Sequence, residues 1–194
     1  EPYTHSLRKT IEFMGAEEKA RFRFVTKYND VDSLLDANHN NHTEIRFSIN
    51  TPKIIDIYEH YTASASKRIE AAVKVANAGY QIGFIIAPVF LYENWKDEYR
   101  DLIKSIKEKL PKDFNQSIIF EVISHRYTTK AKNRINEIYP ETTLPMNDDN
   151  RKFKYGQFGY GKYVYSKEEL DDIKDFFKKE IKEIFPDSFI KYVI

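Results

Sequence analysis

Residues 82–89 have the sequence IGFIIAPV, which is apolar almost throughout. A strand with one face in water alternates polar and apolar side chains, whereas a continuous apolar run is typical of a parallel strand buried on both faces. Further segments with strand character occur before and after this run, and amphipathic helical patterns separate them. This alternation predicts an α/β fold, in which right-handed crossovers connect parallel strands. The predicted strands are 21–26, 44–50, 82–89 and 117–124. Helices are predicted within segment 64–80 and over 93–109, between successive strands, and over 128–139, after strand 117–124.

The two ends of the chain add further predicted elements. An amphipathic helix is expected over 3–15, and a second one over 167–184. Residues 151–165 have the character of a β-hairpin, and the last residues, FIKYVI, predict a closing strand. Within helix 64–80, Ser66 is the candidate N-cap and Gly79 the residue that ends the helix.

Charge and cysteine content limit the available chemistry. The net charge of +1 comes from 31 basic and 30 acidic residues, so any contact with phosphates must come from local clusters. There are no cysteines, which excludes disulfides, thiolate metal sites and a cysteine nucleophile within this chain. His39 and His42 lie in an asparagine-rich connector without a nearby third ligand, so we expect no metal site there. No apolar run approaches the roughly 18 residues that cross a bilayer.

The predicted strands end on residues suited to a small-molecule site. Lys27 ends the first strand, Ser48 and Asn50 end the second, and Ala87 with Pro88 ends the third. Ligands of parallel sheets gather beyond the carboxyl ends of the strands, which lie about 4.8 Å apart. Lys27 therefore predicts a contact with a ligand anion such as a carboxylate. The alternatives are a surface lysine where the strand leaves the core, or a lysine that forms a Schiff base with a carbonyl substrate.

The predicted hairpin combines cations with aromatic rings and contains no acidic residue. Cations suit phosphates, and exposed rings suit stacking on bases, so we expect DNA contacts here. The alternative is a hairpin whose aromatic residues pack on the domain. Its glycine pattern, GQFGYG, neither follows a buried strand nor opens a helix, which argues against a dinucleotide loop. The segment HRYTTKAKNR, 125–134, is also basic and is either one solvated helix face or part of the same phosphate-facing surface.

Five sequence segments, in this order and spacing, resemble the carboxyl-terminal part of the spore photoproduct lyase family. They are RFVTKY, IRFSIN, KRIEAAVKVANAGYQIGFIIAPVF, HRYTTKAK and KYGQFGYGKYVY. The resemblance implies a radical S-adenosylmethionine enzyme with a partial (β/α) barrel. Such an enzyme repairs the DNA lesion 5-thyminyl-5,6-dihydrothymine by returning it to two thymines, in the cytoplasm of the spore core. It further implies that residues 1–140 are part of the barrel and that 141–194 are a hairpin, helix and strand extension.

The resemblance also assigns roles to single residues. It implies that Lys27, Ser48 and Ala87 contact S-adenosylmethionine. At the hairpin tip, family members carry an arginine followed by a tyrosine that contact DNA, and these positions are Gln157 and Phe158 here. The full expected set of DNA-binding residues is Tyr155, Gln157, Phe158, Arg126 and Lys154.

One family feature is missing from the chain. The CxxxCxxC motif that holds a [4Fe–4S] cluster is absent, and so is the cysteine that quenches the product radical. We therefore expect a carboxyl-terminal fragment of a spore photoproduct lyase that is inactive alone, with no catalytic residue and with its cluster ligands elsewhere. The alternative is a non-catalytic DNA-binding module derived from the same barrel.

Overall fold

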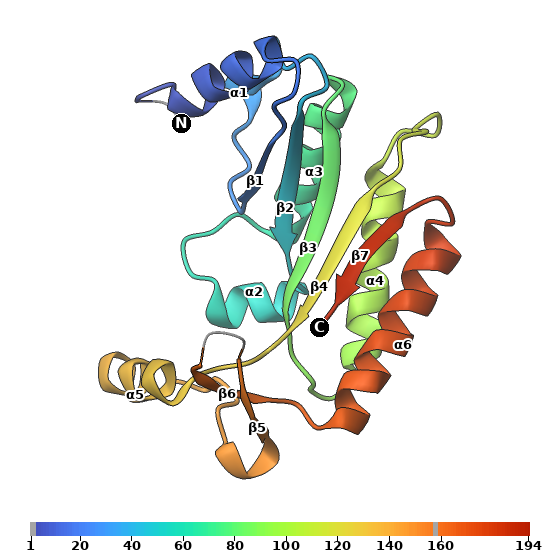
Figure 1. The fold of residues 1–194 in the computed structure, drawn as a ribbon. Coiled ribbons are helices and arrows are strands. Elements are labelled where there is room, and N and C mark those ends of the chain that lie inside the picture. Colours follow the sequence, from blue (N-terminus) through green and yellow to red (C-terminus); the bar gives the residue numbers. More distant parts are fainter. Residues whose placement is uncertain (1–2, 157–158) are drawn as a thin grey trace.

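The computed structural model describes residues 3–156 and 159–194. Strands and helices alternate along most of the chain, as Figure 1 shows. The strands are β1 (Phe22–Thr26), β2 (Thr43–Ile49), β3 (Gln81–Val89), β4 (Ile119–Ser124), β5 (Lys152–Tyr155), β6 (Gly161–Val164) and β7 (Phe189–Val193). The helices are α1 (Ser6–Ala16), α2 (Pro52–Tyr58), α3 (Ala65–Asn77), α4 (Trp95–Lys109), α5 (Thr129–Ile138) and α6 (Lys167–Ile184), with short 3₁₀ turns at Asp32–Leu34 and Asp148–Asn150.

Five parallel strands form the main sheet in the order β1-β2-β3-β4-β7, which confirms the predicted α/β class. β3 lies in its centre, and Ile82 to Ile86 are all buried. This agrees with the apolar run in its sequence, because a central parallel strand is covered on both faces. β5 and β6 form a separate antiparallel hairpin.

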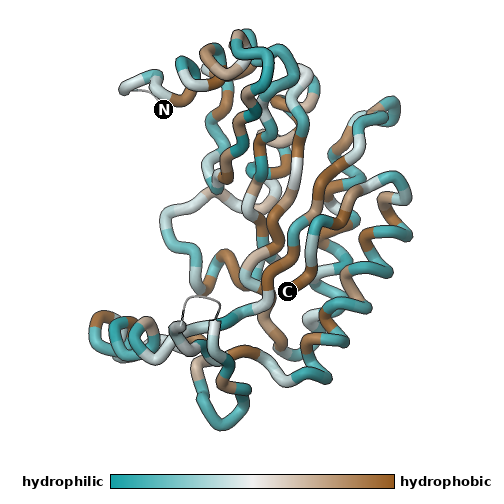
Figure 2. The backbone as a smooth tube through the Cα atoms, viewed as in Figure 1, coloured by the Kyte–Doolittle hydropathy of each residue, from teal (hydrophilic) through white to brown (hydrophobic). Residues whose placement is uncertain are grey.

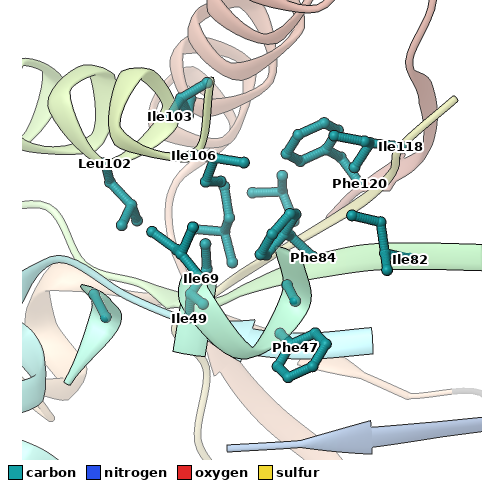
Figure 3. Packing of buried hydrophobic residues seen from close by; sticks show 14 of the residues in the cluster. Phe47, Ile49, Ile69, Ile82, Phe84, Leu102, Ile103, Ile106, Ile118 and Phe120 are labelled. Carbon is teal, nitrogen blue, oxygen red and sulfur yellow. The ribbon is translucent and has the colours of Figure 1, made fainter. Parts of the chain in front are cut away.

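One face of the sheet forms the hydrophobic core. The register places Phe47 beside Phe84 and Phe84 beside Phe120, so one row of rings crosses three strands. Side chains of α3 and α4 cover this row, and Ile69, Leu102 and Ile106 are each 3% exposed or less (Figure 3). In Figure 2 hydrophobic colour runs along the strands, while the loops at the sheet ends are mostly hydrophilic.

The structure corrects two details predicted from the sequence. Ser64, not Ser66, is the N-cap of α3, since its hydroxyl accepts from the Lys67 backbone N–H at 3.4 Å. Helix α2 was not predicted, although Pro52 at its first position and the capping Thr51 are both helix-start signals. Gly79 follows α3 with a φ of 90°, as expected for a residue that ends a helix.

The carboxyl ends of β1, β2 and β3 point toward α2, α5 and the hairpin, which therefore gather beyond the same edge of the sheet (Figure 1). We call the end of the sheet at which these strands finish, together with the residues that follow each strand, the carboxyl edge. Within 141–194, the hairpin lies at the carboxyl edge, whereas β7 pairs with β4 and completes the sheet. A division near residue 140 stays a prediction. None of the helices in the described ranges has the length and apolar composition needed to cross a bilayer.

Candidate functional site at the carboxyl edge

Lys27, Ser48 and Ala87 lie on three neighbouring strand ends. Thr26 pairs with Phe47, so Lys27 comes next to Ser48, and Ser48 in turn pairs with Ile85, two residues before Ala87. Because side chains alternate along a strand, Ser48 points to the face opposite the phenylalanine row, and Lys27 and Ala87 flank it on the two neighbouring strands. The strand ends thus converge as the sequence predicted, while the roles of the three residues stay a prediction.

Lys27 is held by a carboxylate that the sequence analysis did not identify. Its Nζ lies 2.8 Å from Oε1 of Glu59, just beyond α2. The Lys27 side chain is 40% exposed, whereas that of Glu59 is only 7% exposed. An ammonium in an ion pair is not a nucleophile, which argues against the Schiff-base alternative. It remains a cation at the carboxyl edge, where an anionic ligand can reach it.

Glu59 is in turn fixed by Arg68, a fully buried arginine of α3. Nη2 of Arg68 donates to Oε2 of Glu59 at 2.7 Å, and Nη1 donates to the backbone carbonyl of Ser48 at 2.9 Å. Nε donates to the carbonyl of Ala63 at 2.7 Å. One guanidinium therefore joins the ends of β2 and α2 and fixes the partner of Lys27. An arginine next to Ile69, on the apolar side of a predicted helix, was the signal in the sequence.

A second buried network fixes the ends of β2 and β3. The side-chain amide of Asn50 donates to the carbonyl of Pro88 at 2.7 Å, and its oxygen accepts from the Tyr99 hydroxyl at 2.8 Å. The Tyr99 hydroxyl also accepts from the Phe90 backbone N–H at 3.2 Å. Burial raises the pKa of Tyr99 well above its usual value, so the hydroxyl keeps the proton that it donates. The segment after Ala87 is thereby held in one position.

The hairpin separates its cations and its rings onto two faces. Phe153 pairs with Tyr163, and Lys154 pairs directly with Lys162. Since neighbouring residues point to opposite faces, one face carries Phe153, Tyr155 and Tyr163 and the other carries the lysines. Phe153 is 50% exposed and Tyr155 73% exposed. The alternative interpretation, that the aromatic residues of this segment pack on the domain, is correct for Tyr165, which is 4% exposed. It is wrong for Phe153 and Tyr155.

The structure joins part of the basic segment 125–134 to the hairpin. Tyr127 and Tyr163 exchange two backbone hydrogen bonds, of 3.2 and 2.7 Å. Burial lowers the pKa of Lys162, and the nearby charges of Arg126 and Lys154 lower it further. Lys154 pairs with Lys162, and the bridge between Tyr127 and Tyr163 brings Arg126 to the same part of the hairpin; we call these three residues the cation trio. By contrast, Lys132 and Arg134 form ion pairs with Asp148 and Glu137. Gln157 and Phe158, the expected tip contacts, lie outside the described residues.

His125 lies between the sheet and the hairpin. Its ring stacks on Phe90 with centroids 4.6 Å apart, and its Nδ1 lies 3.2 Å from Nη2 of Arg151. Burial, and secondly the charge of Arg151, lower the pKa of His125 from 6.5 to about 4. The ring is therefore neutral near pH 7, and Nδ1 can accept from the guanidinium.

This shift predicts a pH dependence of stability. Between pH 6.5 and 4 the unfolded chain binds a proton at His125 that the folded protein does not bind. The free energy of unfolding should therefore fall by up to about 3 kcal/mol as pH drops through this window. Urea unfolding at pH 7, 5.5 and 4 measures the dependence of the free energy of unfolding on pH. In His125→Phe the part of this dependence that comes from His125 should be absent. Replacement of the exposed His60 is the control, and equal slopes for wild type and His125→Phe would contradict the prediction.

The parallel sheet, the fixed groups at its carboxyl edge and the two-faced hairpin define an α/β protein with a candidate ligand site at the strand ends. The model of the family described as Spore photoproduct lyase matches residues 1–194. The chain belongs to the spore photoproduct lyase family.

Relatives of known name agree with this family. The spore photoproduct lyase of Clostridium acetobutylicum is 55% identical over all 194 residues, which are 57% of its own length. That of Bacillus subtilis is 44% identical over 97% of this chain and 55% of the relative. A solved lyase variant with bound AdoMet and dinucleoside spore photoproduct superposes with a TM-score of 0.94 at 44% identity, over 98% of this chain and 56% of that one. The chain thus spans somewhat more than half the length of these relatives.

Proposed function

We propose that this chain supplies the cofactor-holding edge and the DNA-holding hairpin of a radical S-adenosylmethionine lyase. That enzyme would return 5-thyminyl-5,6-dihydrothymine in DNA to two thymines. The observation that carries the proposal is the position of Lys27, Ser48 and Ala87 at the ends of three adjacent parallel strands, within a family match along the whole chain. We also propose the spore core as its location, because its substrate would be spore DNA.

The residues at the carboxyl edge suit S-adenosylmethionine. Lys27 offers a partly exposed cation for the carboxylate of the methionine part, and Glu59 keeps that cation in place. Ser48 and Ala87 have small side chains, which would obstruct a ligand at the strand ends less than large ones. When bound, S-adenosylmethionine together with an iron–sulfur cluster supplies the radical chemistry of such enzymes.

The cluster does not fit the residues of this chain. A [4Fe–4S] cluster is held by cysteine thiolates, and the 194 residues contain no cysteine. Its ligands would have to come from outside these residues, so we propose that they are inactive on their own. The same observation favours a second candidate, a non-catalytic DNA-binding module.

One chimera distinguishes the two candidates. In this chimera the chain replaces the matching segment of the Clostridium acetobutylicum lyase. If the proposal holds, the chimera supplied with S-adenosylmethionine and a reductant converts the lesion in an oligonucleotide to two thymines, and the unfused chain does not. Binding to the oligonucleotide without conversion, by a chimera that holds its cluster, would support the module instead.

The cation trio is proposed to contact DNA phosphates. Like charges directly opposite each other on a hairpin are destabilising, so the pair of Lys154 and Lys162 favours an anion between them and Arg126. Lys162 was not among the residues expected from the sequence. Its pairing with Lys154 exists only in the folded hairpin, so the sequence alone did not indicate it.

Neutralising Lys162 should reveal such a contact. For Lys162→Gln in the chimera, we expect about ten-fold weaker duplex binding near 0.1 M salt, and a slope of log affinity against log salt that is less negative by about 0.9. Fluorescence anisotropy over a range of salt concentrations measures both. Lys112→Gln, in the loop between α4 and β4, is the matched control and should change neither value. An unchanged slope for Lys162→Gln would remove it from the DNA surface.

A further inference from the structure

Arg151 lies at the root of the hairpin, one residue before β5. Its guanidinium makes several polar contacts with two segments outside the hairpin. Nη1 donates to the His125 carbonyl at 3.0 Å, and Nη2 donates to the Pro145 carbonyl at 3.2 Å. Nη2 also lies 3.2 Å from Nδ1 of His125. Both terminal nitrogens are therefore engaged within the protein and are not aimed at a ligand.

The same guanidinium lies on the residue that leaves the hairpin. Its central carbon is 3.6 Å from the ring centroid of Tyr165, directly after β6. The Tyr165 hydroxyl accepts from the backbone N–H of Leu91 at 3.1 Å. Arg151 and Tyr165, which flank the hairpin, thus contact each other. Tyr165 bonds the segment after β3, which follows Ala87, and Arg151 bonds the segment after β4, which contains His125.

Among the described residues, the two strands of the hairpin differ in how firmly they are held. All four residues of β5 are exposed, whereas β6 is joined to the segment after β4 by the backbone bridge and the ring stack between Tyr163 and Tyr127. These contacts hold only the β6 side of the hairpin. Arg151 supplies a second fixed point, on the β5 side.

We propose that Arg151 is a positioning residue that sets the direction of the hairpin relative to the carboxyl edge. The inference rests on the proposed function, since the hairpin it orients carries the cation trio and the exposed rings. The planar fork of arginine can reach two carbonyls while it stacks on a ring, and a lysine cannot replace this combination. The role therefore depends on the shape of the side chain and not on its charge.

Hydrogen exchange of the 194-residue chain tests the positioning without DNA. Arg151→Lys keeps the charge and Arg151→Met removes it, and both should speed exchange of the β5 and β6 amides at least ten-fold. Exchange in β3 should stay unchanged, which shows that the variants fold. Arg134→Lys on α5, where Arg134 is paired only with Glu137 among the described side chains, is the matched control. Wild-type exchange in Arg151→Lys would overturn the proposal.

Duplex binding by the chimera then separates this inference from the proposed function. Arg151→Lys should weaken binding about as much as Arg151→Met, by at least five-fold, whereas a simple phosphate contact would be preserved by lysine. Full affinity in Arg151→Lys together with lost affinity in Arg151→Met would overturn the proposal. If neither Arg151 nor Lys162 variants affected binding while hairpin exchange increased, the positioning would stand and the DNA-binding function would fail.

Discussion

Arg68→Met is expected to lower the free energy of unfolding by about 3 to 5 kcal/mol. The reason is the carboxylate that the substitution leaves behind. Glu59 is nearly buried, and Arg68 supplies one of its two cationic partners at 2.7 Å. The other partner, Lys27, is partly exposed and compensates less of the lost interaction. The carbonyls of Ser48 and Ala63 lose their bonds from Arg68 as well. The end of β2 and the start of α3 are therefore no longer joined through this side chain.

Urea unfolding at pH 7 measures this effect, and two further variants identify its cause. Arg134→Met removes an arginine that is 65% exposed, and it should change the free energy of unfolding by less than about 0.5 kcal/mol. The double variant Arg68→Met/Glu59→Gln no longer buries a carboxylate and should recover part of the loss. A double variant no more stable than Arg68→Met would show that the cost comes from packing and the lost carbonyl contacts, not from the unpaired charge.

Lys27→Ala is expected to weaken the affinity of the chimera for S-adenosylmethionine by about 5- to 150-fold. This range corresponds to the loss of one charge-assisted hydrogen bond, about 1 to 3 kcal/mol. Stability should change little, because the Lys27 side chain is 40% exposed and Glu59 keeps its bond to Arg68. Isothermal titration calorimetry measures the affinity, and urea unfolding checks the stability.

Lys53→Ala is the matched control for the cofactor contact. Lys53 lies in the first turn of α2, is 48% exposed and has its nearest carboxylate, Glu98, at 3.8 Å. It shares the surroundings of the carboxyl edge but lies within a helix, four residues after the end of β2. Equal affinities of Lys27→Ala and wild type would remove Lys27 from the cofactor site. An equal loss in Lys53→Ala would indicate a general electrostatic effect of the edge.

Local sequence patterns predicted most of the elements because they report burial directly. The predicted bounds of α6 were 167–184, and its structure begins and ends at the same residues. There Ser166 and Glu169 form a capping box, and the apolar residues recur at helical spacing. The start of α3 was wrong by two residues, since Ser64 and Ser66 are equally good caps by composition. In the structure Ala65 is buried, which agrees with a helix that begins directly after Ser64.

By itself, the sequence determined the α/β class, the order of the strands along the chain and the positions of Lys27, Ser48 and Ala87 at their ends. The tertiary structure alone decided which groups meet there: Glu59 with Lys27 and Arg68, Lys162 with Lys154, and Arg151 with His125 and Tyr165. The physical reason is the range of the interactions. Hydrophobic periodicity acts within a few residues of the chain, whereas these contacts depend on how parallel strands lie side by side and where the loops beyond them return.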